Sequence, residues 1–180
     1  MPAAFVIRLL GADSVTSAAL AQALAQALTA TGRRTALVQT QPAPADPAEL
    51  AAQTDAARWG HEIIVVDQSA DASAPGRGLI TALARADLTL LLALDAATAS
   101  PAQRQHDVEL RSVLLAARQG WSVIGGTTTS ERLQAALAAH AGELRRRQPV
   151  TAGVAAGWRH ACGRCGDPDC ERHSKVAARG

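Results

Sequence analysis

Short apolar runs alternate along the chain with longer segments in which apolar residues recur at helical spacing. The clearest run is EIIVVD, in which four consecutive β-branched residues precede Asp67. Runs of this length and composition are typical of strands buried on both faces of a parallel sheet. We expect five strands, at Ala4–Leu10, Arg34–Gln39, Glu62–Asp67, Leu88–Leu94 and Trp121–Ile124.

The segments between these runs are rich in residues that favour helix, mainly Ala, Leu and Gln. In the first of them, Leu20, Leu24 and Leu28 recur every four residues and predict one buried helix face. We expect helices at Ser17–Thr31, Pro47 to about Arg58, Leu79–Arg85, Val108–Gln119 and Ser130 to about Arg147, with Asp95–Asp107 irregular. Strands that alternate with helices predict an α/β fold with a parallel sheet.

Composition separates this α/β body, residues 1–148, from a linker and tail, residues 149–180. The chain is 48% hydrophobic but only 2% aromatic, so its core must be aliphatic. The net charge is +2, whereas Arg145–Gly180 alone holds eight basic and three acidic residues. No apolar run approaches the roughly 18 residues that cross a membrane, and the start of the chain resembles no leader peptide. We expect a cytoplasmic protein that makes no membrane contact.

A glycine turn joins the first predicted strand to the first predicted helix, which is the setting of a phosphate-binding loop. Such a loop reads G-x-x-x-x-G-K-[ST]. Counting from Gly11, the chain has Thr16, Ser17 and Ala18 where the second glycine, the lysine and the magnesium-binding hydroxyl belong. Losing charge neutralisation in the transition state slows a reaction by about 10³-fold or more. We therefore expect no efficient phosphoryl transfer, while loose anion binding at the helix N-terminus remains an alternative to a purely structural turn.

Three stretches resemble one family. GADSVTSAALAQALAQAL is similar to the GAESTGKSTLAQAL opening of P-loop ATPases related to the nicotinamide-riboside kinase domain of bacterial NAD-biosynthesis regulators. ADLTLLLAL with PAQRQHDVELR resembles the fourth strand and lid of that family, and GWSVIGGTTTSERLQAALAAH resembles its last strand and helix. The resemblance covers roughly residues 5–140, and the motifs keep the family's order and spacing.

The resemblance implies a three-layer kinase-like fold with a five-stranded parallel sheet in the order 2-3-1-4-5. It also implies a site for ATP and Mg²⁺, with Asp67 as the Walker-B or acceptor-base residue and Arg104 and Arg111 as lid arginines that stabilise the transferred phosphate. The nucleotide-binding residues it implies are Gly11, Ala12, Asp13, Ser14, Val15, Thr16, Ser17 and Ala18. The chain departs from the family at QTQPAPADP and at Gln68, where the family has an acidic-aromatic-arginine segment and a threonine.

Each candidate residue also has a purely structural interpretation. Asp67 ends a strand at the edge where open α/β sheets bind ligands, which favours a role as metal-water ligand or base. Its structural interpretation is that it caps the start of a loop. Arg104 and Arg111 act on phosphate, with Arg104 in a lid loop before the helix, or are solvated surface residues. Three further residues could line the same crevice, although the sequence signal for each is weaker: Asp13, Asp95 and His106.

All three cysteines lie in the tail, in the pattern Cys162-x2-Cys165-x4-Cys170-x2-His173. Zinc prefers four tetrahedral nitrogen or sulfur ligands, and x2 spacing lets one turn aim two of them at a single ion. We predict a structural zinc site, with His160 as the alternative fourth ligand. The competing interpretation is a tail with three reduced, free cysteines.

These observations support three hypotheses. The first is a catalytically impaired relative of the P-loop kinases, a pseudokinase with weak nucleotide or phosphate binding, a regulatory or scaffold role, and a zinc knuckle that contacts a protein partner. The second is an active small-molecule kinase in which Arg8, Arg104 or Arg111 replaces the lysine. The third is a nucleic-acid-binding protein that uses its basic tail, although those arginines also suit a solvated helix end.

Overall fold

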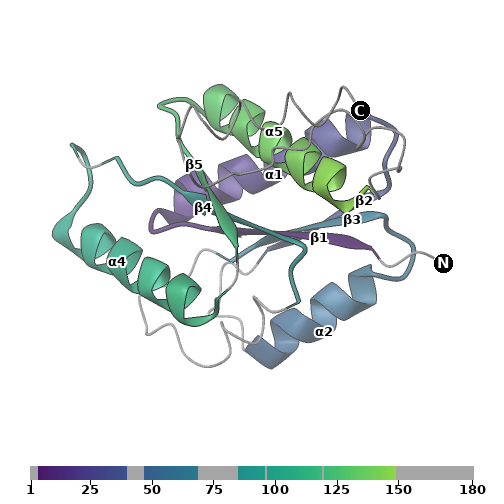
Figure 1. Ribbon diagram of the computed structural model, residues 1–180, viewed down its shortest axis with the longest axis horizontal. Coiled ribbons are helices and arrows are strands. Elements are labelled where there is room, and N and C mark those ends of the chain that lie inside the picture. The colour runs from purple at the N-terminus through teal and green to yellow at the C-terminus, as the bar shows by residue number, and fades with distance from the viewer. Residues whose placement is uncertain (1–3, 40–46, 69–84, 96, 119, 149–180) are drawn as a thin grey trace, which may run out of the picture. The chain divides into compact units, whose positions relative to one another are not determined.

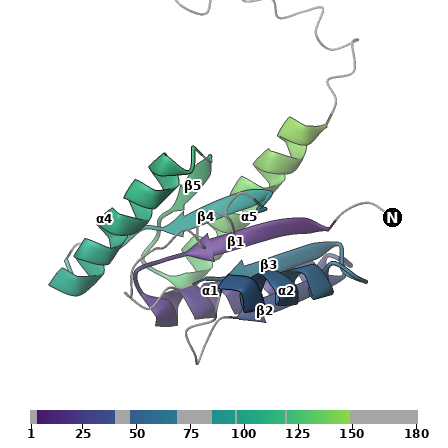
Figure 2. The same cartoon turned by 90° about the horizontal axis from the view of Figure 1, so that it is seen from below.

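A parallel sheet of five strands organises the described part of the chain, which in this computed structural model comprises residues 4–39, 47–68, 85–95, 97–118 and 120–148. The strands are β1 (Phe5–Leu10), β2 (Thr35–Gln39), β3 (Ile63–Asp67), β4 (Leu88–Leu92) and β5 (Trp121–Ile124). Their order across the sheet is β2-β3-β1-β4-β5, and every neighbouring pair is parallel (Figure 2). The α/β class and the sheet order are therefore confirmed.

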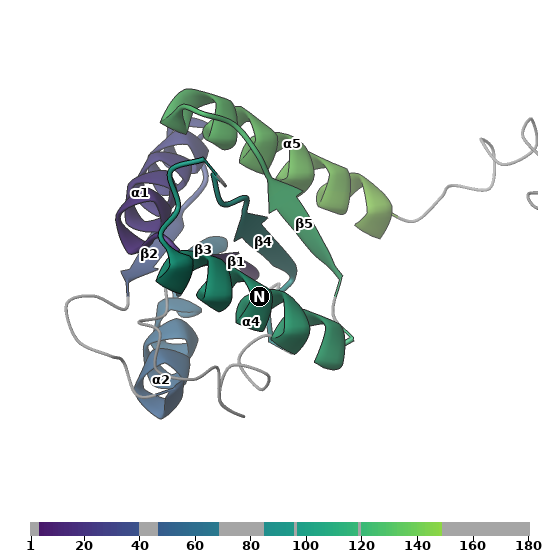
Figure 3. The ribbon, with the colours of Figure 1, turned by 90° about the vertical axis from the view of Figure 1, so that its left-hand side faces the viewer.

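Helices cover both faces of this sheet. They are α1 (Ser14–Ala30), α2 (Pro47–Ala57), α4 (Pro101–Ala116) and α5 (Thr129–Arg147). Helices α1 and α5 lie on one face, while α2 and α4 lie on the other (Figures 1 and 3). Right-handed crossovers account for the faces of α1, α2 and α4, because the chain moves one way from β1 to β2 and the opposite way from β2 to β3 and from β4 to β5. The predicted helix Leu79–Arg85 lies outside the described residues, except for Arg85, which is in a turn.

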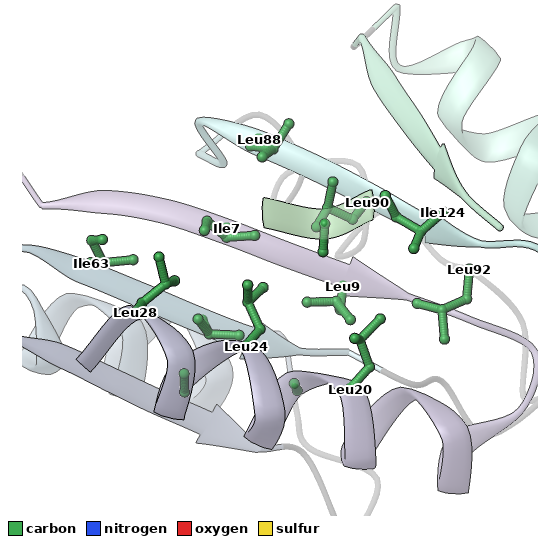
Figure 4. Close-up of a cluster of buried hydrophobic side chains, with 14 residues drawn as sticks. Ile7, Leu9, Leu20, Leu24, Leu28, Ile63, Leu88, Leu90, Leu92 and Ile124 are labelled. Atoms are coloured by element: carbon green, nitrogen blue, oxygen red, sulfur yellow. The ribbon is translucent and has the colours of Figure 1, made fainter. Parts of the chain in front are cut away.

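Two aliphatic layers hold the helices to the sheet, because side chains along each strand alternate between its faces. On the α1 side, Ile7 and Leu9 of β1 pack in one cluster with Leu20, Leu24 and Leu28 (Figure 4). This confirms the predicted helix face. On the other side, the buried apolar residues of the sheet pack against Leu50 of α2 and against Leu110 and Leu114 of α4, in two further clusters. The core is aliphatic, as the composition predicts.

Three helix starts differ from the sequence prediction. Helix α1 begins at Ser14 rather than Ser17, after the cap residue Asp13. Helix α4 begins at Pro101 rather than Val108, so the C-terminal half of the segment predicted to be irregular is helical. Ser100 accepts a hydrogen bond from the Gln103 N–H while the Gln103 side chain accepts one from the Ser100 N–H, which is a capping box. Helix α5 begins after Thr128 rather than at Ser130, because the Thr128 hydroxyl accepts a bond from the N–H of Glu131.

The buried face of α5 carries a histidine. His140 is 7% exposed, and its ring meets Phe5 edge-on with the ring centroids 5.1 Å apart. The spacing of Leu133, Leu137 and Leu144 places the three on one face of this helix, but Leu144 is 37% exposed. Helix α5 therefore places an ionisable ring in an aliphatic layer.

We expect the folded state to lose stability as the pH falls below about 6.5. Burial, and then the charge of Arg33, lower the pKa of His140 below its usual 6.5. The unfolded chain therefore binds more protons than the folded chain between the two pKa values, which favours unfolding on acidification. Urea unfolding of the wild type and of His140→Leu across this pH range measures the effect. A variant whose stability falls as steeply as that of the wild type would contradict the assignment.

Candidate functional site

The turn between β1 and α1 is shorter than a phosphate-binding loop. It comprises only Gly11, Ala12 and Asp13, because α1 begins at Ser14. Of the eight residues predicted to bind nucleotide, Ser14–Ala18 therefore lie in the first turns of a helix. A cradle that wraps backbone N–H groups around a phosphate needs Ser14, Val15 and Thr16 in an open loop before the helix. This geometry differs from the cradle that the family resemblance implies.

A carboxylate occupies the N-terminus of α1. The Asp13 side chain accepts hydrogen bonds from the N–H of Val15 at 3.2 Å and of Thr16 at 3.5 Å. Its second oxygen accepts one from the Thr16 hydroxyl at 2.5 Å. Asp13 thus caps the helix and places a negative charge where the helix end would otherwise attract an anion. The N-terminus of α1 is poorly suited to a phosphate group.

The position of the missing lysine is filled by an internal pair. The Ser17 hydroxyl donates to the Asp67 carboxylate at 2.7 Å, and both residues are 0% exposed. Asp67 ends β3, next to Leu9 in the register of the sheet. The bond therefore joins the start of α1 to the carboxyl end of β3. In this arrangement Asp67 is buried and engaged with the protein itself.

Arg8 lies on the opposite side of the sheet from this pair. Because Ile7 and Leu9 face α1, the Arg8 side chain between them faces the other layer, where its guanidinium donates to the Gln68 side chain. Arg8 is 2% exposed, and burial lowers its pKa to about 10. The hypothesis in which Arg8 takes the place of the lysine is not supported, because Arg8 points away from the start of α1.

The two predicted lid arginines both belong to α4. Arg104 is exposed in its first turns, and Arg111 lies two turns further along, so Arg104 is not in a lid loop before the helix. The Arg111 Nε donates to the Asp107 carboxylate at 2.7 Å. The structure therefore does not bring the three predicted catalytic residues together: Asp67 is buried beside α1, on the other face of the sheet from α4 (Figure 1).

A cleft of about 360 Å³ opens at the carboxyl ends of β1 and β4. The chain leaves these adjacent strands toward opposite faces, and ligands of open α/β sheets bind at such a switch point. Its walls come from the β1–α1 turn, the segment that joins β4 to α4, the segment that joins β5 to α5, and the first turns of the three helices that follow. Asp13 and Asp95 both line it, as expected. His106 does not; it is 3% exposed on α4.

Asp95 and Arg132 give the cleft charges of opposite sign. Asp95 accepts bonds from the Ala97 N–H and the Thr98 hydroxyl, both at 3.0 Å. The Ala97 bond, then the Thr98 bond, and to a smaller degree the charge of Arg132, lower the pKa of Asp95. The Arg132 Nε donates to the Gly126 carbonyl at 2.9 Å. Asp95 is therefore ionised at neutral pH, in the field of a guanidinium that the backbone holds in place.

Sequence reasoning missed the part of this cleft that follows β5. Thr127 and Arg132 line it, and Gly126 before them has a φ of 129°. A Cβ atom at Gly126 would lie 2.8 Å from that of Glu131, so the turn requires glycine. The pair Gly125-Gly126 directly after a short strand was the available signal, since such a turn marks the carboxyl end of a strand.

The predicted zinc ligands Cys162, Cys165, Cys170 and His173, with His160, lie outside the described residues. Within the described ranges, no group of three or more His, Cys, Asp or Glu residues is placed to hold a metal ion. No helix in the same ranges is long and apolar enough to cross a membrane.

Comparison with known proteins adds no relative. No protein-family model matches the sequence, and no curated protein matches it. The relationship to the P-loop kinases therefore stays a prediction.

Proposed function

We propose that the protein is a non-catalytic ligand-binding domain of P-loop-kinase-like architecture, with a regulatory or scaffold role. The observation that carries this proposal is the bond between Ser17 and Asp67, fully buried at the position of the family lysine. A lysine there would reach the transferred phosphate, and a carboxylate at the end of β3 would hold the metal or accept a proton. Here the two positions are instead hydrogen-bonded to each other inside the protein.

The charges around the β1–α1 turn support the same conclusion. Phosphoryl transfer requires cations at the phosphate oxygens, where negative charge develops in the transition state. The turn instead presents the Asp13 carboxylate. Arg111 is paired with Asp107 on α4, and neither Arg104 nor Arg111 lines the cleft. Among the described residues, Arg132 is the one cation that lines the cleft, which therefore lacks the lysine and the lid arginines that the family resemblance implies. The cleft remains available for a ligand.

We expect the purified protein to release no ADP from Mg-ATP beyond the buffer blank. The missing cationic groups would have to be replaced for transfer to proceed at an enzymatic rate. A coupled ADP assay with nucleosides as acceptors measures this, with Asp67→Asn and Arg104→Gln assayed in parallel. Steady ADP release that either substitution abolishes would refute the proposal and establish the alternative, an active small-molecule kinase.

We further propose that the tail binds one structural zinc ion and contacts a protein partner through the resulting knuckle. Four ligands within twelve residues complete a tetrahedral site and leave no open position for catalysis. We expect about one zinc per chain by mass spectrometry of the purified protein. Cys165→Ser should lose the metal and Asp169→Asn should keep it, while His160→Ala and His173→Ala identify the fourth ligand. A metal-free protein with three titratable thiols would refute this site.

A further inference from the structure

The polar groups of the cleft differ in what they can still offer to a ligand. The hydroxyl hydrogens of Thr16, Thr98 and Thr127 are already donated, to the carboxylates of Asp13, Asp95 and Glu131 respectively. These hydroxyl oxygens can therefore serve a ligand only as acceptors. The carboxylates beside them are acceptors as well. Most of the polar wall thus accepts hydrogen bonds rather than donating them.

Arg132 and Gln103 supply the donors. Arg132 uses its Nε on the Gly126 carbonyl, and the described residues give its two terminal nitrogens no hydrogen-bond partner. Gln103 uses its side-chain oxygen on the Ser100 N–H, which leaves its amide nitrogen as a donor. Arg132 and Asp95, both in the described part of the chain, form no ion pair, since no nitrogen of Arg132 lies within 4.0 Å of an Asp95 oxygen. The charge of Arg132 nevertheless lowers the pKa of that carboxylate. One cationic donor and two carboxylates, Asp13 and Asp95, therefore line one cleft.

We infer that this cleft binds a small, phosphate-free ligand that carries an amino or amide group toward Asp95 and one acceptor toward Arg132. The inference rests on the proposed function, since it concerns the same cleft. A phosphate ester would bring two negative charges against two carboxylates and one guanidinium, which is unfavourable. A ligand rich in donors matches the hydroxyl and carboxylate oxygens. Nucleosides with an amino-substituted base and free amino acids both have this chemistry.

Nuclear magnetic resonance of the ¹⁵N-labelled full chain tests the inference. Adenosine, cytidine, L-glutamine, ATP and inorganic phosphate are titrated separately. We expect at least one of the first three to shift the amide signals of Ala12, Ala93 and Thr127. Its dissociation constant should be about tenfold lower than that of ATP. A response to the nucleosides alone, or to glutamine alone, identifies which of the two ligand classes binds. Tighter binding of ATP or phosphate, or no response to any phosphate-free probe, would overturn the inference.

Two substitutions test the assigned contacts. Asp95→Asn keeps an acceptor for the Ala97 N–H but removes the charge, and Arg132→Gln removes the cation. Each should weaken binding about tenfold, since each removes a charged hydrogen-bonding partner. Glu109→Gln removes a carboxylate on α4 that does not line the cleft and should change nothing. Equal affinity in all three variants would overturn the inference. Tight ATP binding without turnover would overturn it and leave the non-catalytic role intact.

Discussion

Replacing Leu24 by alanine is expected to lower the free energy of unfolding by about 2–5 kcal/mol. Leu24 is fully buried on α1, between Leu20 and Leu28, in the layer that joins the helix to the sheet (Figure 4). The substitution removes apolar area from this layer and leaves a cavity that a close-packed aliphatic core fills only in part.

Urea unfolding followed by circular dichroism measures this change. Val15→Ala is the matched control, since it shortens an apolar side chain on the same helix at a position that is 77% exposed. The control should change stability by less than about 0.5 kcal/mol. If both variants unfolded at the urea concentration of the wild type, α1 would not pack on the sheet as described.

Removing the Ser17 hydroxyl is expected to cost about 1.5–3 kcal/mol, the range for a hydrogen bond to a charged group. Ser17→Ala deletes the donor that faces Asp67 at 2.7 Å, in a place that water does not reach. The carboxylate then loses part of its compensation for burial. The change in volume is small, so the loss reports on the bond itself rather than on packing.

Ser112→Ala provides the comparison. Ser112 is exposed on α4, and its hydroxyl donates to the Val108 carbonyl of its own helix at 2.8 Å. Water can replace that bond, so this variant should stay within about 0.5 kcal/mol of the wild type. If Ser17→Ala were equally neutral, Ser17 would not hold α1 against β3. The proposal that this pair replaces the catalytic lysine would then fail.

The sheet could be predicted almost completely from the sequence. Its strands are short apolar runs bounded by turn residues, and this signal is local. The start of α4 was missed because the residues after Pro101 are mainly polar and lack an apolar stripe. The pattern Ser100-x-x-Gln103 before them was the available evidence, since it is a capping box written in the sequence.

Part of the candidate site was predictable, namely Asp13 and Asp95 as lining residues and the absence of the catalytic lysine. Comparing Thr16, Ser17 and Ala18 with the family motif shows that the lysine is missing, which needs no structure. What takes its place is a contact between Ser17 and Asp67, fifty positions apart. The placement of Asp95 and Arg132 in one cleft likewise depends on how the segments that follow β4 and β5 come together. Such contacts are set by the tertiary fold, so no local sequence pattern predicts them.

The turn at Gly126 ties the selectivity of the cleft to a residue without a side chain. Its carbonyl anchors Arg132, and its α-carbon lies so close to the first turn of α5 that even a methyl group would push against Glu131. Enlarging this residue would tilt the helix and carry the guanidinium away from Asp95. A methyl group that touches no ligand could thereby retune which molecules the protein accepts.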